Sequence, residues 1–433
     1  MRRVCLTLPT NRECVAVLPE IAEEARYAAE HFGVTVVLLI LDSAAAPDRD
    51  AHAEVLAALP PAAGVEVVHL DEHDQRRFLR TLVATAGVGK PDLIAELMLP
   101  AAVSYGACTN RAFLIAAALG CETVHRRDSD SGYQVHDGAK VFPIHEELAV
   151  LGRPATEVAA TVARVELDPV PAGPVVLAGA SFVGDLSVDI ADIRSLDPVA
   201  YHDIVSLWAP GDATPAQRRD LVEESFRGSG EPFTGDHALL TVVDPMRVDM
   251  CNIAFAGVHE RCPLPPATDT IGSDYFLFHL IRSAGLPGVL HRRDIVNFHT
   301  AERKTEAGFL GYQRRLVKFL LSMPYLHFVY RGMAAIGAGL TERDVVHLVR
   351  ESSWLPRDEN ERKLDNLEVS YRRLGGRYSA VADDLASRRE VLLAEARRDM
   401  EDFALLISSW AALMSAARSS GFRAAHAPAA ESA

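Results

Sequence analysis

Gly106 to Ser131 of this chain read Gly-Ala-Cys-Thr-Asn-Arg-Ala-Phe-Leu-Ile-Ala-Ala-Ala-Leu-Gly-Cys-Glu-Thr-Val-His-Arg-Arg-Asp-Ser-Asp-Ser. The apolar run in the first half predicts a helix from Asn110 to Leu119. Thr109 precedes this helix as a capping residue, and Gly120 stands where it should end. The segment therefore predicts a helix that leads at once into the acidic residues that follow.

Two carboxylates close the segment. A short strand is predicted from Glu122, so Asp128 and Asp130 should follow at its carboxyl end. Ligands of open α/β sheets collect outside the carboxyl ends of strands, and carboxylates one residue apart can share a divalent cation with nucleotide phosphates. The alternative is a solvated turn, because Asp and Ser are common turn residues.

The composition is that of a globular protein. The chain has 433 residues, enough for about two or three domains, and 49% of them are hydrophobic and 24% charged. A formal net charge of −15 argues against nucleic acid or an anionic membrane as the main partner, because neither attracts an acidic surface. The high Ala and Arg content resembles that of proteins from high-GC bacteria.

Neither disulfides, export nor a membrane span is predicted. The 6 cysteines are scattered without a Cys-x-x-Cys pair, which indicates free thiols in a reducing cytoplasm. No signal-peptide apolar region follows Arg2 and Arg3. Val34 to Leu41, the longest apolar run of the amino-terminal half, is far shorter than the roughly 20 residues that cross a bilayer. We therefore expect a cytoplasmic protein.

The amino-terminal part alternates predicted strands and helices. Residues 3–8 and 34–41 read as strands and residues 15–32 as the helix between them, which makes a parallel βαβ unit. No Gly-x-Gly-x-x-Gly follows the first strand, so a dinucleotide fold has little support. The alternation continues with a strand at 65–70 and helices around 50–59, 75–86 and 92–97.

The middle of the chain gives weaker signals. Residues 132–147 read as a loop over the site, strands return at 174–180 and 239–243, and a helix is predicted near 198–207. The Gly-rich segment 228–235 is either a mobile loop or a lid that closes on substrate.

The order of motifs across residues 3–300 resembles a GT-A type glycosyltransferase, closest to the family-2-like group. The later motifs are the segments around Asn252-Ile-Ala-Phe, Gly272-Ser-Asp-Tyr-Phe and Asn297-Phe-His-Thr. The resemblance implies a mixed central sheet with helices on both faces, a nucleotide and metal half at about 1–150 and an acceptor half at about 170–300. It also implies a UDP or GDP sugar donor, a Mn²⁺ or Mg²⁺ ion, and a small-molecule or glycan acceptor.

The resemblance assigns the donor-side residues position by position. The loop after the first strand and the carboxylate after the second match residues that contact the base and ribose, and an Asn-Arg pair matches a helix start before the metal motif. The donor-side residues are Pro9, Thr10, Asn11, Arg12, Asp42, Asn110 and Arg111.

The same resemblance assigns the metal residues. Asp128-Ser129-Asp130 matches the Asp-x-Asp motif, with Asp130 as the direct ligand and Asp128 nearer the ribose. His299 matches a late His that closes the metal site. One imidazole among carboxylates suits Mn²⁺ somewhat better than Mg²⁺.

The acceptor side carries the proposed base. Asn252 matches the Asn of a Gly-Asn-x-Ala strand, with Cys251 in place of Gly, and Asp274 matches the carboxylate that accepts the acceptor proton. At a helix amino terminus the dipole would lower the pKa of Asp274 and keep it ionised. Its alternative role is a helix cap, which Ser273 fills equally well; Ser273 also stands where Glu is usual.

Two further features have open interpretations. His-Arg-Arg-Asp occurs at residues 125–128 and again at 291–294, where Arg126 and Arg292 either bind phosphate as a pair or belong to solvated faces. His136 and His145 are either metal ligands or structural residues, and lone loop histidines are more often the latter.

The chain becomes helical after Thr300. Residues 301–423 are predicted as an all-helical appendage whose apolar faces pack on the first 300 residues or form a homodimer, and 424–433 as a disordered tail. Pro324 should break the first helix. The predicted helices are 308–333, 341–353, 359–374 and 381–417.

Three classes of function remain. A metal-dependent glycosyltransferase of bacterial glycan or natural-product biosynthesis is favoured, because the motifs occur as an ordered set. A nucleotidyltransferase shares the nucleotide-binding half but usually has a Gly-rich basic loop after the first strand, which residues 9–12 are not. The third class is a non-catalytic nucleotide-sugar-binding protein.

Overall fold

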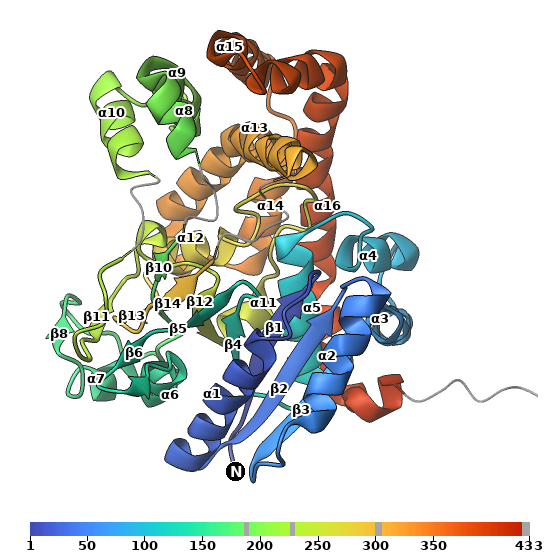
Figure 1. Ribbon diagram of the computed structural model, residues 1–433, viewed down its shortest axis with the longest axis vertical. Coiled ribbons are helices and arrows are strands. Elements are labelled where there is room, and N and C mark those ends of the chain that lie inside the picture. Colours follow the sequence, from blue (N-terminus) through green and yellow to red (C-terminus); the bar gives the residue numbers. More distant parts are fainter. Residues whose placement is uncertain (186–189, 226–229, 299–304, 427–433) are drawn as a thin grey trace, which may run out of the picture.

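A computed structural model describes residues 1–185, 190–225, 230–298 and 305–426. Its centre is a nine-stranded sheet in the order β3-β2-β1-β4-β12-β9-β13-β11-β8, with helices around it and a helical C-terminal region beside it (Figure 1). The predicted fold class, a mixed central sheet with surrounding helices and an all-helical C-terminal region, is confirmed.

The first four strands in the chain are parallel. β1 (Arg3–Thr10) lies between β2 (Thr35–Asp42) and β4 (Thr123–Arg127), and β3 (Val65–Leu70) pairs with the outer side of β2. The loops that follow β1, β2 and β4 therefore leave the same edge of the sheet.

Helices cover both faces of this parallel half. Successive strand residues point to opposite faces, so Leu38 and Ile40 of β2 enter one core and Leu39 and Leu41 another. This double burial explains the unbroken apolar run of β2. The first core is closed by α1 (Val17–Phe32) and α2 (Ala46–Ala58), and the second by α3 (Glu72–Ala86), α4 (Pro91–Met98) and α5 (Tyr105–Ala118).

The other half of the sheet is mixed. β12 (Asn252–Ala256) runs antiparallel to β4 and to β9 (Leu177–Gly179). Asn252 pairs with Arg127, so the residues that precede β12 meet those that follow β4 at one edge. The remaining strands of this half are β13 (Gly288–Leu290), β11 (Leu239–Thr241) and β8 (Arg164–Val165).

Residues 132–147 are not a loop, contrary to the prediction. β5 (Ser131–Tyr133) joins β14 (Ile295–Asn297) and β10 (Phe182–Gly184) in a second sheet. A hairpin of β6 (Val135–His136) and β7 (Ala139–Lys140) follows, because Asp137 and Gly138 adopt the positive φ angles, 50° and 78°, that a two-residue turn needs. The short helices of the α/β part are α6 (Ile144–Val150), α7 (Ala155–Val158), α8 (Ala191–Leu196), α9 (Pro198–Val205), η1 (Ser206–Trp208), α10 (Pro215–Glu224), η2 (Pro245–Arg247), α11 (Val258–Arg261) and α12 (Phe276–Ser283).

The C-terminal region begins with a helix that the sequence predicted to be broken. α13 (Glu306–Ile336) continues through Pro324. Met323, Tyr325 and Leu326 are all buried, so packing around Pro324 outweighs the backbone hydrogen bond that proline removes. The helices that follow are η4 (Gly337–Gly339), α14 (Glu342–Ser352), α15 (Asp358–Leu374) and α16 (Tyr378–His426).

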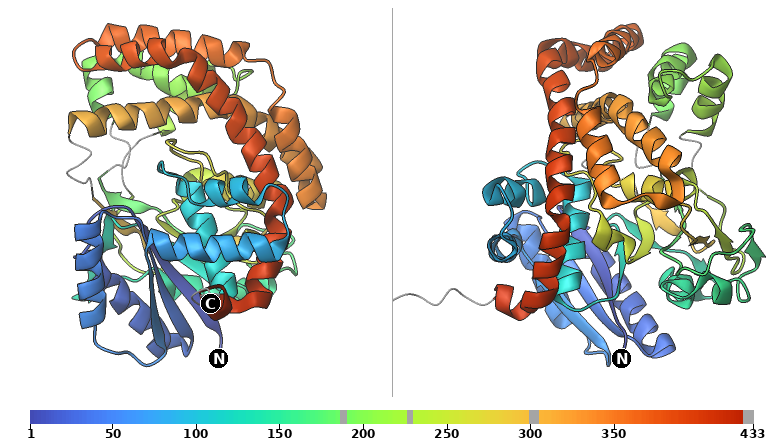
Figure 2. Two further views of the ribbon diagram at one scale, coloured as in Figure 1. Left: turned by 90° about the vertical axis from the view of Figure 1, so that its right-hand side faces the viewer. Right: turned by 180° about the vertical axis from the view of Figure 1, so that it is seen from behind.

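The helical region shares its core with the sheet. Figure 2 shows α16 running from the far end of the helical region down along the α/β part, where it packs against α3 and α5. Trp410 of α16 is fully buried and donates a hydrogen bond from Nε1 to the His259 carbonyl at 3.0 Å. One continuous apolar cluster includes residues of β2, α5 and α16. The helices described after residue 304 therefore share one apolar core with the sheet.

Part of the predicted disordered tail belongs to the last helix. α16 extends to His426, so residues 424–426 of the expected disordered tail are helical, and 427–433 lie outside the described residues. Within the described ranges, every helix is either too short or too polar to cross a bilayer.

Candidate functional site

A cavity of about 230 Å³, which we call the edge cavity, lies where β1, β2 and β4 end. The structure brings most of the predicted donor and metal residues together there, because the loops after parallel strands converge. Of the predicted residues, the edge cavity is lined by Pro9, Thr10, Asn11, Arg12, Arg111, Asp128 and Asp130.

Both carboxylates of the Asp128-Ser129-Asp130 motif are paired with arginines. Arg12 Nη1 lies 3.0 Å from Asp130 Oδ2, and Arg126 Nη2 lies 2.9 Å from Asp128 Oδ1. Ser131 Oγ donates to the Asp128 carbonyl at 2.7 Å and so holds the backbone of the motif. Residues 129 and 130 form a turn, in which Asp130 is only 8% exposed, so the turn is not fully solvated.

Arg126 joins this motif to a third carboxylate. Its Nη1 lies 3.4 Å from Asp274 Oδ2 and donates to the Met250 carbonyl at 2.8 Å. Burial lowers the pKa of the Arg126 guanidinium, but Asp128 and Asp274 outweigh burial and raise it. Arg126 is thus a buried cation shared by two carboxylates.

Asp274 has a different position and a different pKa from those predicted from the sequence. α12 begins at Phe276, and its N-cap is Tyr275 without a side-chain hydrogen bond, so Asp274 does not cap this helix. Burial raises the pKa of Asp274 to about 6, and Asp128 and Asp249 act in the same direction against Arg126. The predicted lowering of this pKa by the helix dipole is wrong, because burial and like charges dominate. Asp274 therefore changes protonation near neutral pH.

Asp249 adds a fourth carboxylate. Its Oδ2 accepts a hydrogen bond from the Tyr275 hydroxyl at 2.8 Å, and its Oδ1 accepts one from the Cys251 N–H at 3.0 Å. It stands just before β12, whose first residue pairs with the last residue of β4. This pairing explains why residues 249 and 128, far apart in sequence, meet at one site.

The helix before the motif starts earlier than predicted. α5 begins at Tyr105, and its cap is Ser104, whose hydroxyl accepts from the Ala107 N–H at 3.1 Å. Thr109 lies inside the helix and donates its hydroxyl to the Tyr105 carbonyl at 2.9 Å. Ser104 and Thr109 are both suitable capping residues. The apolar pattern that predicted the helix does not extend back to its first residue, Tyr105, so Thr109 was chosen.

Contacts at the start of α5 hold the segment that carries Asp274. A Cβ on Gly106 would lie 1.9 Å from the Pro265 carbonyl oxygen, so only glycine allows this approach. The Gly106 N–H also donates to Ser273 Oγ at 3.3 Å. Ser273, which stands where the resemblance expects Glu, therefore connects α5 to the segment that carries Asp274.

Three predicted binding residues, Asn110, Asn252 and Asp42, do not line the edge cavity. Asn110 makes two hydrogen bonds to the backbone of Leu264, each 2.8 Å long. Asn252 donates from Nδ2 to the carbonyls of Ser181 and Arg293 at 3.0 and 2.9 Å. The side chains of Asn110 and Asn252 join loops of the site without facing a ligand space.

Asp42 was predicted to follow the second strand; it is the last residue of β2, and its side chain is fully buried. Its Oδ2 accepts from His52 and His69 at 2.9 Å each, and these bonds lower the pKa of Asp42 although burial opposes them. Cys14 Sγ lies 3.5 Å from His52 Nε2, which aligns Cys14, His52 and Asp42 like a nucleophilic triad. His52 Nε2, however, accepts from the Cys14 N–H at 2.9 Å, and burial raises the pKa of the thiol to about 12. This group is structural.

His299 lies outside the described residues. The chain before it approaches the motif, because the Phe298 N–H donates to the Asp130 carbonyl at 2.9 Å and Asn297 pairs with Ser131. The backbone that precedes position 299 therefore runs beside Asp130.

A second cavity of about 560 Å³, which we call the helix-lined cavity, adjoins the first. Tyr105 and Asp128 line both, and Asp249 and Asp274 line the second. One wall comes from a single face of α13, whose lining residues are Tyr312, Phe319, Met323, Leu326, His327 and Tyr330.

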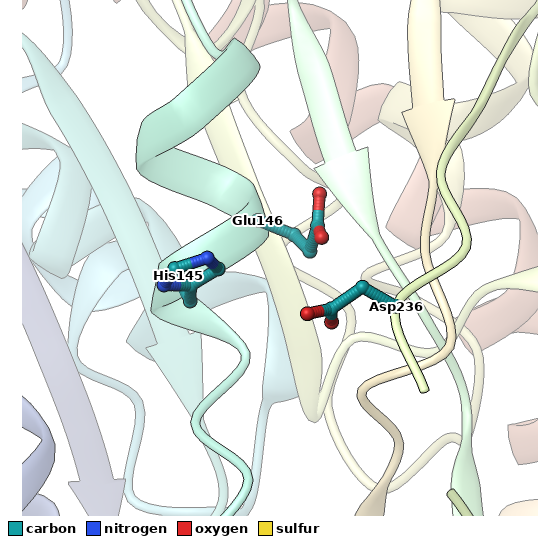
Figure 3. A group of neighbouring side chains, drawn as sticks. All are labelled: His145, Glu146 and Asp236. Atoms are coloured by element: carbon teal, nitrogen blue, oxygen red, sulfur yellow. The ribbon is translucent and has the colours of Figure 1, made fainter. Parts of the chain in front are cut away.

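Another group of possible metal ligands lies apart from both cavities. His145, Glu146 and Asp236 each offer a ligand atom within 4.8 Å of the others, and Figure 3 shows the two α6 side chains beside Asp236. Asp236 is paired with Arg293 at 2.6 Å, and His145 Nδ1 lies 2.7 Å from the Tyr27 hydroxyl. Burial lowers the pKa of His145 and raises that of Glu146. These contacts connect α6 to neighbouring segments of the fold.

The two His-Arg-Arg-Asp stretches have different environments. Arg126 of the first lines the edge cavity, whereas Arg292 of the second is exposed and lines neither cavity. Arg127 is buried between Glu24 and Glu147, at 2.8 and 2.9 Å. The separate positions of Arg126 and Arg292 do not support a paired phosphate-binding role for these two arginines.

Sequence reasoning missed several residues of the site. Asp249 and the α13 side chains have no local motif, and Tyr105 lay just outside the predicted helix. The one available signal was the acidic residue three positions before the Asn252 strand.

The sequence matches a family of unknown function (DUF6271) over residues 2–426. A comparison with curated proteins found no match. Solved structures similar to the chain include a mannosyltransferase, PcManGT, from Pyrobaculum calidifontis in complex with GDP-Man and Mn²⁺, with 13% identity, a TM-score of 0.37, and coverage of 97% of this chain and 87% of that one.

Two other similar structures are S. aureus TarS residues 1–349 and mouse xyloside xylosyltransferase 1 in its apo form. TarS has 9% identity, a TM-score of 0.32, and coverage of 95% of this chain and 91% of its own. The xylosyltransferase has 11% identity, a TM-score of 0.23, and coverage of 65% and 74%. The glycosyltransferase resemblance seen in the sequence thus recurs among solved structures, but TM-scores this low carry no conclusion about activity.

Proposed function

We propose a function from the site itself, since this chain belongs to DUF6271, a family of unknown function, and membership alone assigns no activity. The proposed activity is metal-dependent transfer of a glycosyl group from a UDP or GDP sugar to an acceptor hydroxyl or amine. The observation that carries it is Arg126, which links Asp128 of the edge cavity to Asp274 of the helix-lined cavity. A donor site and an acceptor site would then meet where the bond is exchanged.

The edge cavity is the proposed donor site. Its lining has three arginines, Arg12, Arg111 and Arg126, against three carboxylates, Glu72, Asp128 and Asp130. A nucleoside diphosphate would add negative charge that this balanced set does not offset. A divalent cation bound together with the nucleotide would restore the balance.

The residues present fit such a cation. Asp128 and Asp130 offer the oxygen ligands that Mn²⁺ and Mg²⁺ prefer, and His299 is the proposed third ligand. The cation would stabilise the charge that develops on the diphosphate leaving group. Arg12 pairs with Asp130 and lines the same cavity, so its guanidinium would donate to a phosphate of the bound nucleotide.

The chain's own contribution to the transfer step is proton removal and orientation. The acceptor oxygen would form a bond to the anomeric carbon while the bond from that carbon to the diphosphate oxygen breaks. Asp274 would take the proton of the acceptor hydroxyl, because its pKa of about 6 keeps it mostly ionised at neutral pH. Arg126 would hold Asp274 in position.

Titration calorimetry of the full-length protein with UDP and GDP, with and without Mn²⁺, tests this function. We expect one nucleotide to bind, at least tenfold more tightly with Mn²⁺. Asp130→Asn and His299→Ala should each remove the Mn²⁺ effect, while the control Asp137→Asn, which alters a carboxylate that is 92% exposed, should keep it. Nucleotide binding that is equal with and without Mn²⁺ would contradict the metal-dependent mechanism.

A further inference from the structure

The helix-lined cavity has walls unlike those of the edge cavity. Trp208 and Phe319 meet edge to face with ring centroids 5.2 Å apart, and His279 stacks on Tyr330 at 3.7 Å. Phe182 lines the cavity near the second sheet. Its volume of about 560 Å³ falls within the range of about 300–1,000 Å³ that small-molecule sites occupy.

The charges around this cavity are of one sign. Asp128, Glu224, Asp249 and Asp274 line it, and no Lys or Arg side chain does so among the described residues. Arg126 contacts two of these carboxylates, Asp128 and Asp274, but one cation against four carboxylates leaves a negative balance, so an anionic ligand would meet repulsion.

The cavity also has a small number of uncharged polar groups. Burial lowers the pKa of His279 to about 4 and that of His327 to about 3, so both rings are neutral at pH 7. His327 Nδ1 is buried and has no hydrogen-bond partner in the described parts of the chain.

These walls discriminate between the acceptor classes that the sequence left open. A glycan carries a hydroxyl group on most ring carbons, and the hydroxyls that face the apolar wall of Phe319, Met323 and Leu326 would find no hydrogen-bond partner there. An aromatic molecule would instead gain contact with the rings.

We propose that the helix-lined cavity binds the acceptor, and that this acceptor is an uncharged, aromatic small molecule with a hydroxyl group rather than a glycan or an anion. This inference rests on the proposed glycosyl transfer. It places the acceptor hydroxyl near Asp274, where the cavity meets the edge cavity.

The test uses 2-naphthol, 2-naphthyl sulfate and maltotriose as probes in titrations of the full-length protein at pH 7. We expect 2-naphthol to bind at least tenfold more tightly than either of the other two. Met246 lines the cavity, yet is 51% exposed, so Met246→Arg should fold and reduce 2-naphthol affinity about tenfold. The matched control is Val369→Arg, at a 67% exposed position of α15 that does not line the cavity.

The outcomes separate this inference from the proposed function. Nucleotide and Mn²⁺ binding without 2-naphthol binding would overturn the acceptor class alone. Tighter binding of maltotriose or of the sulfate, or equal 2-naphthol affinity in Met246→Arg and wild type, would also overturn it. Binding of 2-naphthol without any nucleotide binding would remove the acceptor role together with the proposed transfer.

Discussion

The edge cavity and the helix-lined cavity touch at Tyr105 and Asp128 but differ in almost every other respect. The first is rich in paired charges, and its charged motif Asp128-Ser129-Asp130 and the 9–12 loop follow neighbouring parallel strands. The second is aromatic, and one of its walls is a helix of the C-terminal region. The difference shows that one strand-end motif organises the first site, whereas the second depends on the assembly of the whole chain.

The junction of the two cavities should give the largest effect. Asp274→Asn keeps the shape of the side chain and removes the proposed base, so the transfer rate should fall about 10²-fold or more. The melting temperature at pH 8 should not fall, because burial makes the ionised form of Asp274 unfavourable in the folded protein. Single-turnover kinetics and thermal melting measure the two quantities. A rate within threefold of wild type would show that Asp274 is not the base, and Asp249→Asn would then be the next variant to measure.

A methyl group at Gly106, next to Tyr105 in the wall that both cavities share, should destabilise the protein. Gly106→Ala forces a Cβ against the Pro265 carbonyl next to Tyr105, so we expect a loss of about 1–3 kcal/mol in the free energy of unfolding. Gly311→Ala is the matched control, since Gly311 is also helical and a Cβ there meets nothing within 4 Å. Urea denaturation compares the two. Equal stability of both variants would mean that α5 and residues 263–273 are not held as tightly as described.

The smallest effect concerns protonation at the junction. The pKa of Asp274 is raised from 3.8 to about 6, so its ionised form is lost as pH falls through 6. The transfer rate should therefore drop about tenfold for each pH unit below 6 and be level above it. The contribution of Asp274 to the free energy of unfolding has the opposite trend. It is present at low pH and is lost as pH rises from 3.8 to 6. A rate that is flat from pH 5 to 8 would contradict the role of Asp274.

The sequence predicted the edge cavity better than the helix-lined one for a physical reason. Strand ends that carry Asp128 and Asp130 are local features, and parallel strands bring them together automatically. Asp42 and Asn110 also have the expected positions, but the direction of a side chain depends on partners such as His52 and Leu264 that no local pattern reveals.

The α13 wall illustrates the same limit. Its apolar residues predicted a helix, but core packing and a ligand wall leave the same periodic pattern in a sequence. Pro324 pointed to a break that tertiary packing overrides. The pKa of Asp274 likewise depends on burial and on Asp249, neither of which a helix-start motif contains.

Anomalous diffraction from crystals grown with Mn²⁺ and the nucleotide that binds tests the central claim most directly, because the described residues also offer a competing cation position at His145, Glu146 and Asp236. We predict a Mn²⁺ peak bonded to Asp130 in the edge cavity, next to the diphosphate. A peak at His145, Glu146 and Asp236 with none at Asp130 would contradict the account.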